Sequence, residues 1–143
     1  MASPRWFSWG SLLLAIVGGA IGVALRAALI TPFGAGTHPL VVPAITLAIN
    51  LAGAFLLGFV VGRLAGRHPH LRIFAGTGVL GGFTTYSAFA VQAVTTGTAA
   101  PVIGLLIIVV SLLGGVVAAA LGLVAGRRAA GAPADVESPE DAE

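Results

Sequence analysis

The chain has 143 residues, of which 57% are hydrophobic and only 8% are charged, and its mean hydropathy is +1.04. A soluble domain carries about 25% charged residues, so this chain could not cover a water-facing surface, and we expect an integral membrane protein. The absence of cysteine excludes disulfides, thiolate catalysis and cysteine-ligated metals. The pI of about 10.5 is high, but no basic face with interleaved aromatics is present, so we expect no nucleic-acid partner.

Four apolar stretches follow one another along the chain, and each is close to the ~20 residues that cross a bilayer as a helix. Segments with turn chemistry, rich in glycine, proline and threonine, separate them. Because these loops are short, consecutive helices are expected to pack as neighbours in alternating up-and-down order. We therefore predict an all-α, four-helix transmembrane domain over residues 9–126, with spans at about 9–30, 41–61, 71–95 and 102–125.

The two ends of the chain flank this domain and differ from it in composition. Residues 1–8 form a short N-terminal segment, and 127–143 form a small, polar and acidic tail that we predict to be disordered. All seven basic residues are arginines at or before Arg128, whereas all five acids lie at or after Asp135. The membrane region therefore contains arginine but no carboxylate.

The arginines fall unevenly on the two sides of the predicted bundle. With four spans, both termini and the second loop share one side, and the loops on the opposite side contain no arginine. The positive-inside rule therefore predicts a multi-pass protein of the plasma membrane with both termini in the cytoplasm. The arginines on the cytoplasmic side are Arg5, Arg63, Arg67, Arg72, Arg127 and Arg128.

Glycine pairs recur at the spacing of one helical turn. Small residues four apart let helix backbones approach closely in lipid, so helix packing is the expected role of most of these glycines. The pairs are Gly18 with Gly22, Gly58 with Gly62, and Gly122 with Gly126.

Polar side chains within a span are costly in lipid, so each one is a candidate for function. No Asp, Glu, Lys or His lies deep in a predicted span, which disfavours a proton-coupled transporter. No nucleotide-binding or hydrolytic motif is present either, so we expect a passive conduit or a structural bundle and not an enzyme. The polar residues are Arg26, Thr46, Asn50, Thr84, Thr85, Tyr86, Ser87, Gln92 and Ser111.

Thr46 and Asn50 are four residues apart and therefore share one helix face, which Gly53 extends. Asn50 has two amide donors and Thr46 one hydroxyl donor, and donors on a shared stripe suit an anion. An interhelical hydrogen bond, worth about 1 kcal/mol, is an equally good interpretation of a membrane asparagine.

The remaining candidates also allow two interpretations each. The rings of Tyr86 and Phe89 share a face and could turn their positive edges to a small anion, or they could simply pack. Ser111 could line a polar path or bond back to its own helix. Arg26, a lone charge near the end of the first span, could snorkel to the interface or make an aqueous vestibule attractive to anions.

These pieces together resemble a known family, the Fluc fluoride channels, which are also called CrcB proteins. The resemblance covers nearly all of the membrane region and rests on "GGAIGVALR" (18–26), "TLAINLAGAFLLG" (46–58), "GGFTTYSAF" (81–89) and "SLLGG" (111–115). It implies an antiparallel dimer of four-helix subunits, with two pores built from both chains and a third helix broken in its middle.

The resemblance also implies a structural sodium ion at the dimer centre, which is not transported. The third helix of the family unwinds at the Gly/Thr stretch, and carbonyls there hold the ion; the matching residues here are Gly81 and Thr84. Unwound carbonyls in a membrane need a partner, and a hard cation is one. Thr85 and Ser87 are expected to stabilise the break or to line nearby polar surface.

The pore residues implied by the resemblance are Asn50, Thr46, Ser111 and the ring pair Tyr86 and Phe89. Tyr86 departs from the family's usual phenylalanine, which affects the expected rate and selectivity. Donors and ring edges would replace the hydration shell of fluoride, and sharing the ion among sites would let it leave. The implied function is passive export of cytoplasmic fluoride.

Arg26 resembles the family's vestibule arginine, and the uneven arginine distribution conflicts with an antiparallel homodimer. A homodimer of that kind needs one chain inserted each way, which usually goes with little charge bias. An alternative is therefore one subunit of an obligate heterodimer, paired with an oppositely oriented homologue. Two further alternatives are a small dual-topology drug transporter, which would want a glutamate that the first span lacks, and a purely structural membrane protein.

Overall fold

The computed structural model of the chain describes residues 8–33 and 36–131. All regular structure in these residues is helical. Residues 1–7 of the predicted N-terminal segment and residues 132–143 of the predicted acidic tail lie outside the described residues. The final helix continues to Ala129, so three residues that the sequence assigned to the tail are helical.

Within residues 8–33 and 36–131, three helices are long and apolar enough to cross a membrane by length and composition. Helix α1 spans Trp9–Ile30 and runs into the short 3₁₀ helix η1, Thr31–Phe33. Helix α2 spans Val41–Arg63, and α6 spans Pro101–Ala129. Pro101 stands at the first position of α6, where the missing N–H of proline would have no helical acceptor.

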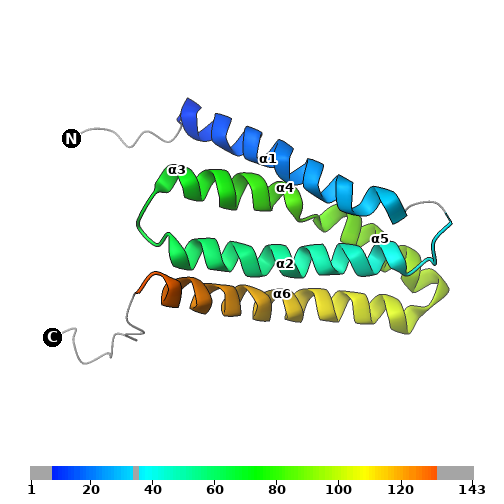
Figure 1. Cartoon of the computed structure of the whole chain (residues 1–143). Helices are drawn as coiled ribbons and strands as arrows, with labels where there is room; N and C mark the ends of the chain where they lie inside the picture. Colours follow the sequence, from blue (N-terminus) through cyan, green and yellow to red (C-terminus); the bar gives the residue numbers. More distant parts are fainter. Residues whose placement is uncertain (1–7, 34–35, 132–143) are drawn as a thin grey trace, which may run out of the picture.

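The chain between α2 and α6 forms a series of shorter helical pieces (Figure 1). These are α3 (Pro69–Arg72), the π-helical stretch η2 (Ile73–Leu80), α4 (Gly81–Phe83) and α5 (Tyr86–Ala99). The first three follow one another without a gap, so the two glycines of the Gly/Thr stretch remain helical. Only Thr84 (ψ 158°) and Thr85 (φ −148°, ψ 117°) leave the helical conformation, and they separate α4 from α5.

The helices pack side by side in a bundle (Figure 1). Helix α2 lies along α6, and α1 lies along η2 and α4, while α5 packs against the first half of α6. The start of α1, the turn between α2 and α3 and the end of α6 lie at the same end of the bundle. The break between α4 and α5 is far from this end, near the middle of the bundle's length.

Glycine determines how closely α2 and α6 approach. A Cβ atom on Gly58 or Gly62 would clash with the backbone of α6, and one on Gly122 or Gly126 would clash with the backbone of α2. A Cβ atom on Gly22 of α1 would likewise clash with the backbone carbonyl of Val79 in η2. The predicted packing role of these glycines is confirmed.

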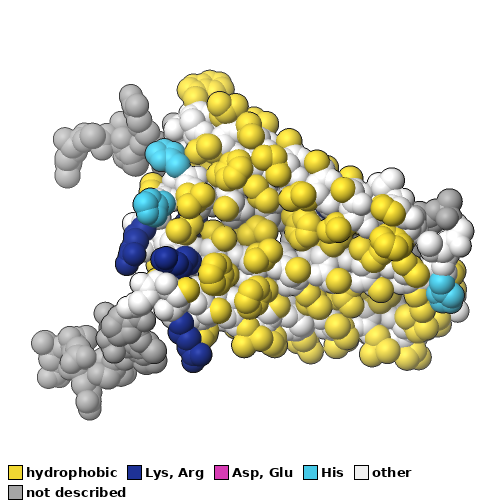
Figure 2. All heavy atoms as spheres, viewed as in Figure 1, with side chains coloured by type: hydrophobic (Ala, Val, Ile, Leu, Met, Phe, Trp, Pro, Cys, Tyr) yellow, Lys and Arg dark blue, Asp and Glu magenta, His cyan; other side chains and the backbone are white. Residues whose placement is uncertain are grey.

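The surface of a single chain is largely apolar (Figure 2). Ile49, Leu80 and Ala93 are the buried hydrophobic residues of the described chain, whereas many leucines, isoleucines and valines are exposed along all the long helices. Arginine gathers at one end of the bundle in the same view. Such a surface suits a bundle surrounded by lipid or by a second membrane chain.

Replacing Gly122 by alanine should destabilise the fold, because its Cβ would lie against the carbonyl of Phe55 and would force α2 and α6 apart. We expect a loss of about 1–3 kcal/mol, as for overpacked cores, measured by thermal unfolding in detergent. Gly19→Ala is the matched control, since its Cβ would meet no atom within 4 Å. Equal melting temperatures for the two variants would contradict this account of the packing.

Candidate functional site

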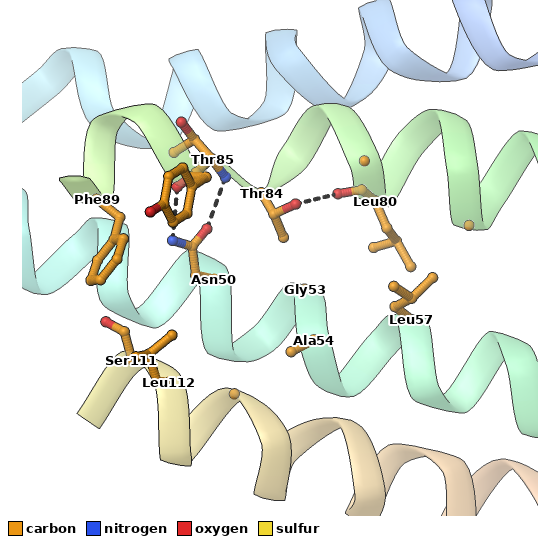
Figure 3. Close-up of a pocket in the computed structure, with 14 residues that line it drawn as sticks. Asn50, Gly53, Ala54, Leu57, Leu80, Thr84, Thr85, Phe89, Ser111 and Leu112 are labelled. Atoms are coloured by element: carbon orange, nitrogen blue, oxygen red, sulfur yellow. Dashed lines mark hydrogen bonds between the residues drawn. The ribbon is translucent and has the colours of Figure 1, made fainter. Parts of the chain in front are cut away.

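The interruption between α4 and α5 is held by a side chain from α2. The backbone N–H of Thr85 donates to Asn50 Oδ1 at 2.9 Å, and Asn50 Nδ2 donates back to the Thr85 carbonyl at 3.0 Å (Figure 3). The amide of Asn50 thus replaces the helical acceptor of the Thr85 N–H, and it adds a second donor to the Thr85 carbonyl, which as the N-cap of α5 already accepts the first bond of that helix. The interhelical hydrogen bond that the sequence allowed for Asn50 is confirmed, and one of its two amide hydrogens is left for a ligand.

Thr85 also begins the helix that follows. Its Oγ1 accepts from the N–H of Ala88 at 3.2 Å and lies 3.3 Å from Ser87 Oγ, so it acts as the N-cap of α5. Threonine at this position satisfies one of the free N–H groups of the new helix inside an apolar bundle. The prediction that Thr85 and Ser87 stabilise the break is confirmed.

These two contacts remove the helical donors of two carbonyl groups. In a continuous helix the carbonyls of Gly81 and Thr84 would accept from the N–H groups of Thr85 and Ala88, four residues further on. Those N–H groups donate instead to the side chains of Asn50 and Thr85. The two carbonyls are the ones that the sequence singled out, and their oxygens are hard ligands of the kind that bind alkali-metal ions.

Arg26 of α1 lies against the same break. Its Nε donates to the carbonyl of Gly82 at 3.3 Å, and the contact is partly buried. In a continuous helix this carbonyl would accept from the N–H of Tyr86, which lies beyond the break. The arginine therefore caps the end of α4, with its positive charge at the negative end of a helix dipole, and does not snorkel freely.

A cavity of about 350 Å³ opens beside the break, between α2, the α4–α5 segment and α6. Asn50 and the ring of Phe89 line it from two sides, and Ser111 of α6 faces them (Figure 3). Among the residues singled out from the sequence, those that line this cavity are Asn50, Gly53, Gly81, Thr84, Thr85, Tyr86, Phe89 and Ser111.

Ser111 carries an unused polar atom in this cavity. Among the described residues, its Oγ is the one buried side-chain oxygen or nitrogen without a hydrogen-bond partner. The bond back to its own helix that the sequence allowed is therefore absent. A buried hydroxyl without a partner is costly, and a ligand that accepts a hydrogen bond would remove that cost.

The two aromatic rings of α5 are adjacent and differently exposed. The centroids of Tyr86 and Phe89 are 5.8 Å apart, with the ring planes at 54°. Tyr86 is 79% exposed in the single chain, so its ring faces outward from the bundle. The pair supplies ring edges beside the cavity, but one side of Tyr86 has no neighbour within the described chain.

Thr46 does not line the cavity. It is 1% exposed, and its Oγ1 accepts a hydrogen bond from Gln92 Nε2 of α5 at 3.0 Å. The sequence provided Gln92 only as a polar residue without a role. Gln92 follows Phe89 by three residues and so shares a helix face with it, and this spacing is the signal from which a role for Gln92 could have been predicted.

The fold and this site define a multi-pass, all-helical membrane protein with a donor-lined cavity at a helix interruption. Residues 13–123 match the family described as CrcB-like protein, Camphor Resistance (CrcB). The chain belongs to this family. The match covers α1, α2, the broken segment and most of α6, and therefore every residue of the site.

Three relatives from different bacteria are each named as a fluoride-specific ion channel, two of them FluC 2 and one FluC. The fluoride-specific ion channel FluC 2 of Bacillus subtilis is 38% identical over 80% of this chain and 86% of the relative. The fluoride-specific ion channel FluC of Mesorhizobium japonicum is 38% identical over 79% of this chain and 93% of the relative. The FluC 2 of Leifsonia xyli subsp. xyli is 52% identical, over 57% of this chain and 59% of the relative.

Replacing Asn50 by leucine should loosen the break, because the buried N–H of Thr85 would lose its acceptor, and the Thr85 carbonyl would lose the second of its two donors. We expect a loss of about 1–3 kcal/mol for the unsatisfied N–H group. The measurement is amide hydrogen exchange of the peptide that contains Thr85, which should become faster, with Thr95→Val as a control on an exposed hydroxyl of α5. Unchanged exchange at Thr85 would refute the pinning role of Asn50.

Proposed function

We propose that this chain is a subunit of a fluoride-specific ion channel that passively exports fluoride from the cytoplasm. The observation that carries the proposal is the buried, unpartnered hydroxyl of Ser111, which shares a cavity with the free amide hydrogen of Asn50 and the ring of Phe89. Membership of the CrcB-like family and the printed names of its relatives support fluoride as the ion. The chain is a conduit and not an enzyme.

The residues of the cavity would act by replacing water around the ion. Asn50 and Ser111 each supply one hydrogen-bond donor, and the positive ring edges of Phe89 and Tyr86 supply weak attraction on the other side. No carboxylate occurs among the described residues to repel an anion. Because each donor is single and the donors are separate, fluoride would be held well enough to enter and weakly enough to leave.

The pair of Thr46 and Gln92 would extend this path toward the loop end of α2. The amide of Gln92 uses one of its two hydrogens on Thr46, so its second hydrogen is left for an anion, whereas Thr46 itself is buried and acts by orienting Gln92. Arg26 would stay next to the break, where it bonds to the carbonyl of Gly82, and its positive charge would raise the local concentration of anions in the adjoining vestibule.

The proposal includes a second chain. The pieces α3, η2, α4 and α5 would form one broken span, which together with α1, α2 and α6 makes four. In an antiparallel dimer, the exposed ring of Tyr86 and the open side of the cavity would be covered by the partner, so that each of two pores uses both chains. The arginine end of the bundle would be cytoplasmic, which favours an oppositely oriented homologue as the partner over a second copy.

A structural sodium ion fits the carbonyls of Gly81 and Thr84, because their helical donors are used by other groups. When bound, the ion would supply a positive charge that joins the breaks of the two chains. The chain's own residues prepare this site: Asn50 keeps Thr85 out of the helix, and Arg26 occupies the intervening carbonyl of Gly82.

The test of function is fluoride efflux from liposomes that contain the purified chain, with chloride as the control ion. We expect fast, fluoride-selective efflux, and Ser111→Ala should slow it about tenfold or more, since one hydrogen bond to a charged ion is lost. The same variant should not lower the melting temperature, because the hydroxyl has no partner to lose.

The outcomes separate the alternatives. Efflux from the chain alone would show that one chain suffices and would refute the obligate heterodimer. Efflux only after co-reconstitution with an oppositely biased homologue would establish the heterodimer. Silence in both preparations would refute the channel.

Removal of sodium is expected to abolish fluoride efflux. The purified chain would be reconstituted in N-methylglucamine salts, and efflux compared with that of the same preparation after sodium is returned. Recovery with sodium and not with N-methylglucamine would support the ion site at Gly81 and Thr84. Full efflux in sodium-free medium would refute that site while leaving the fluoride pathway intact.

A further inference from the structure

At the arginine-rich end of the bundle, the guanidinium groups make no polar contact that stabilises the described part of the chain. Within residues 8–33 and 36–131, no hydrogen bond or ion pair holds the side chains of these arginines, and the same residues include no acid. Figure 2 shows the dark-blue side chains at the edge of the apolar surface. The arginines at this end are Arg63, Arg67, Arg72, Arg127 and Arg128.

Two of these arginines line a cavity of about 380 Å³. Arg67 lies in the turn after α2, and Arg72 ends α3. Leu64 and Ile73 contribute an apolar part of the lining, and Thr77 of η2 contributes a hydroxyl. The cavity shares no lining residue with the one beside the break, so it is a separate site.

The backbone of the turn brings the two arginines to this cavity. The N–H of Arg67 donates to the carbonyl of Leu64 at 2.9 Å, which closes a turn through Gly66 in the left-handed region (φ +69°). His68 also has a positive φ (48°), and its carbonyl accepts from the N–H of Arg72 at 3.1 Å. The chain therefore reverses direction tightly enough for Arg67 and Arg72 to line the same space.

The chemistry of this cavity suits a phosphate group at a membrane surface. Guanidinium groups bind phosphate oxygens through paired, charge-assisted hydrogen bonds, and the hydroxyl of Thr77 can donate a further one. Leu64 and Ile73 would contact the glycerol and the first methylenes of an acyl chain. The position, where apolar helices end and arginines begin, is the depth of a phospholipid headgroup.

We propose that the cavity between Arg67 and Arg72 binds the phosphate of an anionic phospholipid headgroup. A free phosphate would meet the same arginines, but it would gain nothing from the apolar lining. Arg127 and Arg128 at the end of α6 line neither cavity and provide only a diffuse positive field. The assignment does not depend on the proposed channel.

The experiment is native mass spectrometry of the full chain in detergent with added phosphatidylglycerol or phosphatidylcholine. We expect retained phosphatidylglycerol in clear preference to phosphatidylcholine. The double variant R67Q/R72Q should weaken this binding about tenfold or more, at roughly fivefold for each arginine near an anionic headgroup. The matched control R127Q/R128Q removes the same charge from the same end and should change binding less than twofold.

Each other outcome would overturn the proposal. Equal losses in the two double variants would show diffuse attraction without a site, and no preference for phosphatidylglycerol would show no anionic selectivity. Displacement of the lipid by an equal concentration of inorganic phosphate would assign the cavity to free phosphate. If R67Q/R72Q does not elute as a folded species, the single variants R67Q and R72Q give the same comparison, with about fivefold losses expected.

Discussion

The constraint on which this structure depends is that every backbone polar group inside a membrane needs a partner. A helix meets it automatically, and an interruption does not. At Thr84 and Thr85 the chain leaves the helix, and three side chains then replace lost partners: Asn50 for the N–H of Thr85, Thr85 itself for the N–H of Ala88, and Arg26 for the carbonyl of Gly82. The cavity of about 350 Å³ opens beside this break.

The contacts at the break also resolve what the polar residues do. For Asn50 the structural and the ligand-binding interpretations were alternatives in the sequence, but its amide has enough hydrogens for both, since one is used on Thr85 and one is not. The amide of Gln92 likewise uses one hydrogen on Thr46 and keeps the other for a ligand. Ser111 differs, because its hydroxyl makes no contact within the described chain and so adds nothing to the fold of one subunit. A polar atom of this kind marks the place where binding a ligand changes the free energy most.

A single chain provides partners for most backbone groups at the break, but it does not cover its own apolar surface. Glycine lets α2 and α6 lie close enough for their backbones to touch, yet few apolar side chains become buried, and Tyr86 faces outward at the rim of the cavity. In water such a bundle would aggregate, whereas lipid and a second chain can cover it. The charged end shows the same incompleteness, because the arginines lie next to the apolar belt without an acid among the described residues. The proposals of a partner chain and of a bound anionic lipid both follow from these uncovered surfaces.

The sequence by itself determined the class, three of the long helices and the family, because hydropathy, helical spacing and local motifs are properties of neighbouring residues. Gly58 with Gly62 and Gly122 with Gly126 predicted close packing for the same reason, since four residues make one helical turn. Only the tertiary structure decided which groups meet across helices. In the structure, Asn50 bonds to Thr85, and Arg26 donates to the carbonyl of Gly82. Thr46 accepts from Gln92 and does not line the cavity, and Ser111 has no partner. The tertiary structure also limited the break to Thr84 and Thr85 and kept both glycines helical, because the position of Asn50 on α2, and not helix propensity, determines which N–H group leaves the helix.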